Sequence, residues 1–187
     1  MSEVTIRPAA HSDLQWLLEI YNHYILNTPI TFSTRPFSLE EFGHWFEEHS
    51  DGKRYRLVVA VENKDDGHII GYAGTGRFRP KQAYETTVET TIYCRPECTQ
   101  RGVGTLLYRA LFKLIAGEDI HRVVAGVTLP NPASMALHER FGFRHVGTFT
   151  ENGRKFGKYW DVAWFERPLQ LGREIAPSQA NVDAGTE

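Results

Sequence analysis

The sequence predicts an α/β (α+β) domain with a single mixed, mostly antiparallel central sheet flanked by helices. Three observations lead to this fold class. The chain has 187 residues, of which 41% are hydrophobic and 24% charged, which suits one folded domain with a sizeable core. Segments with the two-residue alternation of strands gather in the middle of the chain. Segments with the 3.6-residue spacing of helices are interleaved with them, and no internal repeat or linker interrupts the order.

In the first third of the chain, a short strand at residues 3–8 is followed by two helices, each opened by a capping pattern. Ser12 with Gln15 opens the first helix, and Ser38 with Glu41 opens the second. Thr28-Pro29 ends the first helix, and the second continues to about His49. Apolar residues recur at helical spacing in both: Leu14, Leu17, Leu18, Tyr21 and Ile25, then Phe42, Trp45 and Phe46.

Strand patterns dominate the middle of the chain and return near its end. The predicted strands are residues 55–62, 68–78, 86–94, 122–129, 143–151 and 158–167. One helix follows the third of these, with an apolar stripe of Leu106, Leu107, Ala110, Leu111, Leu114 and Ile115. Another runs from Asn131-Pro132 to Phe141. We expect residues 1–169 to form the folded domain and the polar residues 170–187 a flexible tail.

Charge and hydropathy argue against several function classes. The formal net charge of -2 gives no general electrostatic basis for binding nucleic acid or an anionic membrane. No run of about 18 apolar residues predicts a transmembrane helix, and the N-terminus lacks the pattern of a secretory signal. The two cysteines, Cys94 and Cys98, have no second pair or histidine cluster to complete a zinc site. We therefore expect a cytoplasmic protein that holds no metal.

The segment CTQRGVGTLLYRALFKLI, residues 98–115, places two glycines where a helix must begin. A strand that leads into a glycine-flanked helix start presents free main-chain N–H groups and the positive end of the helix, which together suit a phosphate. Arg101 adds positive charge, and Gly102 and Gly104 would let a bulky polyanion approach the main chain. The alternative is that the glycines only shape a tight turn.

A second strand-to-helix segment follows about thirty residues later, and the pair resembles the GNAT-type N-acetyltransferases. It reads NPASMALHERFGF, residues 131–143. In that superfamily a (Gln/Arg)-x-x-G-x-(Gly/Ala) loop holds the pyrophosphate of acetyl-CoA, and an N-x-x-(Ala/Ser)-x-x-L segment carries a pantetheine contact and a general acid. The resemblance covers about residues 3–168. Here Thr99 stands at the first loop position, and His138 replaces the usual tyrosine.

Four further matches resemble one branch, the phosphinothricin and methionine-sulfoximine N-acetyltransferases. They are YNHY at residues 21–24, TVE at 87–89, the LHERFGF run that contains His138, and KFGKYWDV at 155–162. The resemblance implies the GNAT acyl-CoA N-acyltransferase fold, acetyl-CoA as co-substrate and a homodimer. It also implies the acetyl-CoA-binding residues Ile92, Tyr93, Cys94, Gln100, Arg101, Gly102, Val103, Gly104, Thr105 and Asn131, with main-chain amides of a splayed strand contacting the acetyl group.

Two residues are candidates for catalysis. Glu89 lies in the otherwise uncharged strand TTVETTIY, where partial burial would raise its pKa toward that of a useful base. The alternative is a glutamate that faces solvent or forms a structural ion pair. His138 stands where the superfamily's tyrosine meets the CoA sulfur, so it is a candidate proton donor to the thiolate. A satisfied core histidine is the competing interpretation.

Basic and aromatic residues are candidates for the substrate side of the site. They are Phe32, Arg79, Lys81, Tyr84 and Lys155, which match substrate-side positions of the branch. The resemblance implies direct acetyl transfer to the free amine of a small amino acid or analogue, and cations would hold its anionic groups. Acetylation of a polyamine or a protein N-terminus on the same fold is one alternative. A non-catalytic acetyl-CoA-binding module is another.

Overall fold

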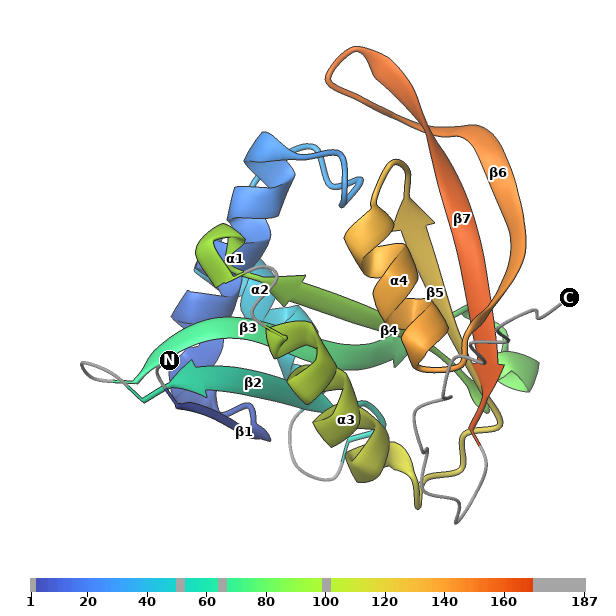
Figure 1. The fold of residues 1–187 in the computed structure, drawn as a ribbon. Helices are drawn as coiled ribbons and strands as arrows, with labels where there is room; N and C mark the ends of the chain where they lie inside the picture. Colours follow the sequence, from blue (N-terminus) through green and yellow to red (C-terminus); the bar gives the residue numbers. More distant parts are fainter. Residues whose placement is uncertain (1–2, 50–52, 64–66, 99–101, 170–187) are drawn as a thin grey trace, which may run out of the picture.

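The computed structural model describes residues 3–49, 53–63, 67–98 and 102–169. A seven-stranded sheet in the order β1-β2-β3-β4-β5-β7-β6 forms the centre of the domain (Figure 1). All neighbouring strands are antiparallel except β4 and β5, which are parallel. The strands are β1 (Val4–Pro8), β2 (Leu57–Glu62), β3 (His68–Arg77), β4 (Thr87–Cys94), β5 (Arg122–Thr128), β6 (Arg144–Lys155) and β7 (Lys158–Pro168). The mixed, mostly antiparallel sheet that the sequence predicts is confirmed.

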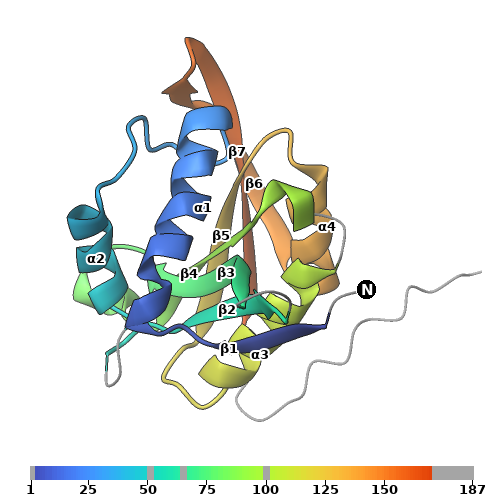
Figure 2. The ribbon, with the colours of Figure 1, turned by 90° about the vertical axis from the view of Figure 1, so that its left-hand side faces the viewer.

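Helices cover both faces of this sheet (Figure 2). On one face lie α1 (Leu14–Asn27) and α2 (Leu39–Glu47), which pack on β2 and β3 through a core that includes Leu17, Phe42 and Tyr72. On the other face lie α3 (Val103–Ile115) and α4 (Pro132–Arg140), with a core that includes Leu107 and Phe165. Short 3₁₀ turns occupy His11–Asp13, Gln82–Tyr84 and Pro96–Cys98. No helix in the described part of the chain is long and apolar enough to cross a membrane.

The capping of α1 differs from the prediction. Asp13, rather than Ser12, is the N-cap residue of α1, and its carboxylate serves the preceding 3₁₀ turn: it accepts from the main-chain N–H of Ala10 at 2.8 Å and pairs with Arg7 at 2.6 Å. Gln15 instead donates to Glu19 along the helix at 3.0 Å. An ionised carboxylate that satisfies both a helix-end amide and a guanidinium makes stronger bonds than a neutral serine hydroxyl can.

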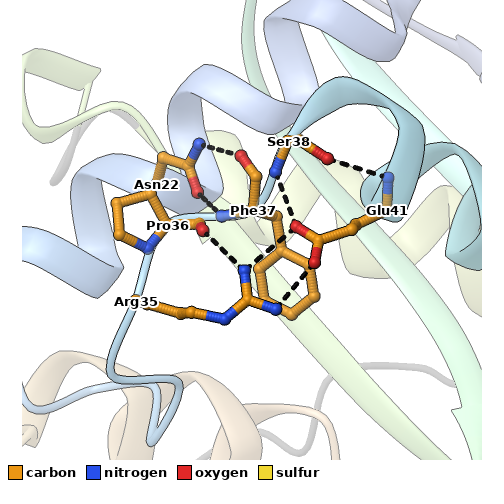
Figure 3. A network of polar contacts seen from close by, with 6 residues as sticks. All are labelled: Asn22, Arg35, Pro36, Phe37, Ser38 and Glu41. Carbon is orange, nitrogen blue, oxygen red and sulfur yellow. Dashed lines mark hydrogen bonds and ion pairs between the residues drawn. The ribbon is translucent and has the colours of Figure 1, made fainter.

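The capping of α2 is confirmed, and it belongs to a network that holds the irregular segment between the two helices (Figure 3). Ser38 Oγ accepts from Glu41 N at 3.2 Å, and the Glu41 carboxylate accepts from Ser38 N at 2.9 Å. Arg35 pairs with the same carboxylate at 2.6 Å. The Asn22 side chain of α1 both donates to and accepts from the main chain of Phe37, at 3.0 and 2.9 Å. The end of this segment is therefore bound to α1.

Between β4 and β5 the sheet divides. The two strands pair only where Thr87–Glu89 face Arg122–Val124, although β4 continues to Cys94 and β5 to Thr128. Past Glu89 the sheet thus consists of two parts, β1–β4 and β5-β7-β6. The separation is the splay that the resemblance implies.

The β6–β7 hairpin is longer than predicted and rises above the rest of the domain (Figure 1). The strand predicted for residues 143–151 continues to Lys155 as β6. A bulge between Phe149 and Gly153 takes up the extra residues, with Glu151 at φ 51°. The Asp161 carboxylate accepts from Glu151 N at 2.7 Å and so satisfies the main chain of the bulge.

Candidate active site

The divided sheet opens onto a cavity of about 640 Å³. Its walls come from β4 and β5, the start of α3, α4, residues 30–32 and the β6–β7 hairpin. Of the residues predicted for the site, Phe32, Glu89, Ile92, Tyr93, Cys94, Gly102, Val103, Gly104, Thr105, Asn131 and His138 line this cavity. Gln100 and Arg101 lie outside the described residues. The gap between two parted strands is therefore where the predicted residues converge.

Main-chain groups of β4 point into this gap. Arg95 N donates to Ile70 O at 2.8 Å, and in an antiparallel pair every second residue bonds to the partner strand. Arg95 and Tyr93 therefore bond to β3, and the N–H groups of Ile92 and Cys94 point away from it. The main chain of Tyr93 is directed to β3, so this residue contributes its side chain to the wall rather than an amide. Tyr24 of α1 donates to Cys94 O at 2.7 Å and fixes the orientation of that peptide group.

The two glycines at the start of α3 meet different requirements. Gly102 is the N-cap with φ 77°, in the left-handed region that favours glycine, and a Cβ there would meet nothing within 4 Å. A Cβ on Gly104 would lie 3.2 Å from Leu137 Cδ2 and 3.5 Å from Ile92 Cδ1. Gly104 therefore allows α3 to pack closely on α4 and β4, whereas Gly102 allows the turn itself. The tight turn thus accounts for Gly102 and helix packing for Gly104, and the approach of a polyanion to this main chain stays a prediction.

Arg140 is a candidate anion-binding residue that sequence reasoning missed. It lies at the end of α4, lines the cavity, and its guanidinium donates to Thr105 Oγ1 in the first turn of α3 at 3.3 Å. A cation beside the N-terminal end of a helix suits a phosphate group. Arg140 lies within the LHERFGF run that marks the family resemblance, but the sequence does not show that this residue contacts the start of α3.

Glu89 lies half-buried in the cavity wall, at the point where β4 and β5 separate. Burial raises the pKa of its carboxyl, and the Arg79 guanidinium opposes that rise. No ion pair joins Glu89 to another of the described residues at salt-bridge distance. The structural ion pair considered above is thus not formed there, and the carboxylate is available to a ligand in the cavity.

His138 is buried, with 2% of its surface exposed, and both of its ring nitrogens are engaged. Nδ1 lies 2.7 Å from Ser134 O, so it carries the proton, and Nε2 accepts from the Tyr108 hydroxyl at 2.9 Å. Burial lowers the pKa of the ring, which favours the neutral form. Tyr108 is a second residue that sequence reasoning missed: it is among the residues that line the cavity, and its hydroxyl lies 3.2 Å from Thr90 Oγ1.

The predicted substrate residues divide into three groups. Phe32 lines the cavity. Arg79, Lys81 and Tyr84 lie on the exposed connection between β3 and β4, outside the cavity wall, with Arg79 over the Phe78 ring at 4.7 Å. Lys155 is buried with 4% of its surface exposed, does not line the cavity, and donates from Nζ to Thr31 O at 2.7 Å.

The residues present fit acetyl-CoA. The N–H groups of the first turn of α3, which have no carbonyl partner within the helix, and the Arg140 guanidinium suit its phosphates. The N–H groups of Ile92 and Cys94 lie along the gap that a pantetheine arm would follow. Asn131 lines the cavity but its side chain accepts from Ser134 N at 3.1 Å, so it caps α4. Within the described ranges, no group of three or more His, Cys, Asp or Glu residues is placed to hold a metal ion.

A strand pair that parts beside a glycine-started helix, with a carboxylate at the fork, defines an acetyl-CoA-dependent N-acetyltransferase. The chain belongs to the GNAT acetyltransferase family: residues 6–164 match its acetyltransferase (GNAT) domain. It is 53% identical over 168 residues to a phosphinothricin N-acetyltransferase of Streptomyces coelicolor, covering 90% of this chain and 98% of that protein.

Two further comparisons agree. The chain is 32% identical to an L-methionine sulfoximine/L-methionine sulfone acetyltransferase of Pseudomonas paraeruginosa, covering 90% of this chain and 96% of that one. A crystal structure of a phosphinothricin acetyltransferase from Sinorhizobium meliloti in complex with acetyl-CoA superposes with a TM-score of 0.85 and 33% identity, covering 96% and 95% of the two chains. The resemblance to this family and the predicted acetyl-CoA co-substrate are confirmed.

Proposed function

We propose that the protein transfers the acetyl group of acetyl-CoA to the free amine of a small amino acid or analogue, of the phosphinothricin and methionine-sulfoximine type. The names of the relatives support this substrate class. The observation that carries the proposal is the position of Glu89, half-buried with a raised pKa where β4 and β5 part. A base is needed there because the attacking amine must lose a proton.

In the proposed mechanism, Glu89 takes the proton of the amine, directly or through a water molecule. The N–H groups of Ile92 and Cys94 donate to the thioester oxygen as negative charge develops on it. The Tyr108 hydroxyl gives its proton to the departing thiolate and is reprotonated by water after the transfer, while His138, whose Nε2 carries no proton, positions the Tyr108 side chain. These assignments are supported by the placement of all five residues in one cavity wall.

Direct transfer is preferred to an acyl-enzyme on Cys94. Burial raises the pKa of the Cys94 thiol to about 12, so its thiolate is scarce near neutral pH. Cys98 lies nearby and raises it further. A cysteine nucleophile needs an adjacent base or cation to lower its pKa, and the dominant influence here works in the opposite direction.

We further propose that the protein is a homodimer that works in the cytoplasm. Four large apolar side chains on the β6–β7 hairpin have more than half of their surface exposed: Val146, Phe149, Phe156 and Tyr159. Within the described residues, β6 is also an edge strand of the sheet, with no strand paired on its outer side. An apolar, unpaired edge of this kind supports association with a second copy.

The test is a screen of acetyl-CoA consumption with methionine sulfoximine, methionine sulfone, phosphinothricin, spermidine and a peptide with a free N-terminus. We expect turnover with one or more of the first three and none with the last two. Turnover only with spermidine or the peptide would support the polyamine or N-terminal alternative. If acetyl-CoA raised the melting temperature while no amine was consumed, the chain would be a binding module.

A further inference from the structure

Residues 30–33 connect the two parts of the divided sheet on the side of the cavity where the main-chain ladder is absent. The ladder joins β4 to β5 through only the three pairs that end at Glu89 and Val124. In Figure 1 the chain that leaves the top of α1 turns toward the β6–β7 hairpin. Ile30, Thr31 and Phe32 line the cavity as they pass. This segment, which we call the clasp, thus closes a site that the sheet leaves open.

On one side, the clasp is bound to α1. The Tyr21 hydroxyl lies 3.0 Å from Thr31 Oγ1 and 3.1 Å from Ser33 Oγ. Tyr21 in turn packs edge-on against Tyr93 of β4, with ring centroids 5.4 Å apart. The clasp is therefore bound to the β1–β4 part of the sheet through Tyr21.

On the other side, the clasp is bound to β5 and to the hairpin at three points. Lys155 Nζ donates to Thr31 O at 2.7 Å, and Thr128 Oγ1 donates to Ile30 O at 3.4 Å. The Phe32 ring lies directly on Gly153, where a Cβ would come within 2.1 Å of the ring. Gly153 is therefore required by the position of Phe32, because any side chain there would displace the ring.

The ammonium of Lys155 is costly at this position. It is 4% exposed, and among the described residues its partners are a carbonyl oxygen and the Phe156 ring, 5.1 Å from Nζ, with no carboxylate at ion-pair distance. A buried charge without a counter-ion lowers stability, so a structural role alone would be served as well by an apolar side chain. What the charge of Lys155 provides is a strong bond to the main chain of the clasp, with a weaker contact to the Phe156 ring.

We propose that Lys155 and Gly153 are positioning residues that hold the clasp across the divided sheet and thereby set the width of the amine end of the cavity. Lys155 acts through Thr31 and Phe32 rather than by touching the substrate. The acetyl-CoA end, formed by α3 and α4, does not depend on the clasp. The inference rests on the proposed function in assigning the amine to the Phe32 end of the cavity.

The test compares Lys155→Met, which keeps the length of the side chain but cannot donate, with Lys158→Met in the exposed part of the same hairpin. We expect Lys155→Met to raise KM for the amine about tenfold, while the Kd of acetyl-CoA from calorimetry stays unchanged. Lys158→Met is expected to change neither. Equal losses at both substrates, or an unchanged amine KM, would overturn the proposal.

A second variant and a second readout keep the test independent of folding and of turnover. Gly153→Ala displaces Phe32 without adding or removing a charge, and it should reproduce the amine effect if Lys155→Met does not fold. Amide hydrogen exchange at residues 30–33 should accelerate in both variants relative to the wild type. If no amine is turned over at all, the proposed function fails, and the exchange measurement still decides whether the clasp exists.

Discussion

In the proposed mechanism, the Glu89 carboxylate at the fork of two strands sets the pH range in which the enzyme works. Because burial raises the pKa of Glu89, the base is protonated at pH values where an exposed glutamate would still be ionised. The ionised form is the one that accepts a proton from the amine. The raised pKa of Glu89 thus lowers activity at low pH, where the carboxyl is protonated. Near neutral pH it raises activity, because the ionised carboxylate is then a stronger base.

We predict that kcat/KM falls as the pH is lowered through an apparent pKa above the ordinary glutamate value. Glu89→Gln should lower kcat by about tenfold or more, the low end of what a general base contributes, and should flatten the acid limb of the profile. Steady-state rates from pH 4.5 to 9 provide the measurement. The matched control is Glu85→Gln on the exposed loop nearby; a profile that keeps its acid limb in Glu89→Gln would remove this residue from the mechanism.

The sequence pointed to Glu89, the proposed base, and not to Tyr108, the proposed acid. Glu89 was visible because it is a lone charge in an apolar strand. Tyr108 was not visible, because it lies within an almost continuous apolar helix and only the packed structure brings its hydroxyl to His138 and Thr90. Both interpretations of His138 have support from the structure: it is buried and satisfied, and it lies in the cavity wall.

Among the elements, α3 shows where periodicity stops being informative. The predicted stripe placed Leu106 and Leu114 inward, but these residues are 37% and 38% exposed. Apolar residues lie on most sides of this helix, so the pattern marks a helix without fixing which side faces the core. The buried face is set by long-range contacts and consists of Val103, Leu107, Tyr108, Leu111, Phe112 and Ile115.

The start of α3 carries a prediction about packing. Replacing Gly104 with Val should force Leu137 and α4 away from α3, since a Cβ already comes within 3.2 Å of the Leu137 side chain. We expect a loss of about 1–3 kcal/mol in unfolding free energy from the overpacking, together with a weaker Kd for acetyl-CoA. Chemical denaturation and calorimetry provide the two measurements.

The comparison for that prediction is Gly117→Val, at a glycine where an added Cβ meets nothing within 4 Å. This variant should leave acetyl-CoA affinity unchanged. Wild-type affinity and stability in Gly104→Val would mean that the two helices are not held in contact at this glycine.

For the whole molecule, the sequence predicted the order of the elements well and their long-range pairing only through the family resemblance. Each strand from β1 to β5 begins and ends within two residues of its expected bounds. What could not be predicted is contact between distant segments, such as Phe32 on Gly153, because local patterning carries no information about which loops meet. The β6 bulge was missed for a related reason, since Asp161, ten residues away, stabilises it.

The proposed association of two copies predicts that a charge placed on the β6–β7 hairpin separates them. If the exposed apolar residues of the β6–β7 hairpin form the dimer interface, Phe149→Asp should shift the protein from dimer to monomer in size-exclusion chromatography with light scattering. Leu39→Asp, which changes an exposed leucine on α2, should leave the dimer intact. A wild-type protein that is monomeric at all concentrations, or a Phe149→Asp variant that stays dimeric, would contradict the assignment.

The seating of the Phe32 ring on Gly153 also has a genetic consequence. Two codons far apart in the gene specify one surface, so a mutation that enlarges residue 153 can be tolerated only alongside one that shrinks residue 32. A chimeric gene that takes codon 32 from one parent and codon 153 from another, with residues of different size, should encode an enzyme with a raised KM for the amine. Mutations that restore activity should then fall at codon 32 or codon 153.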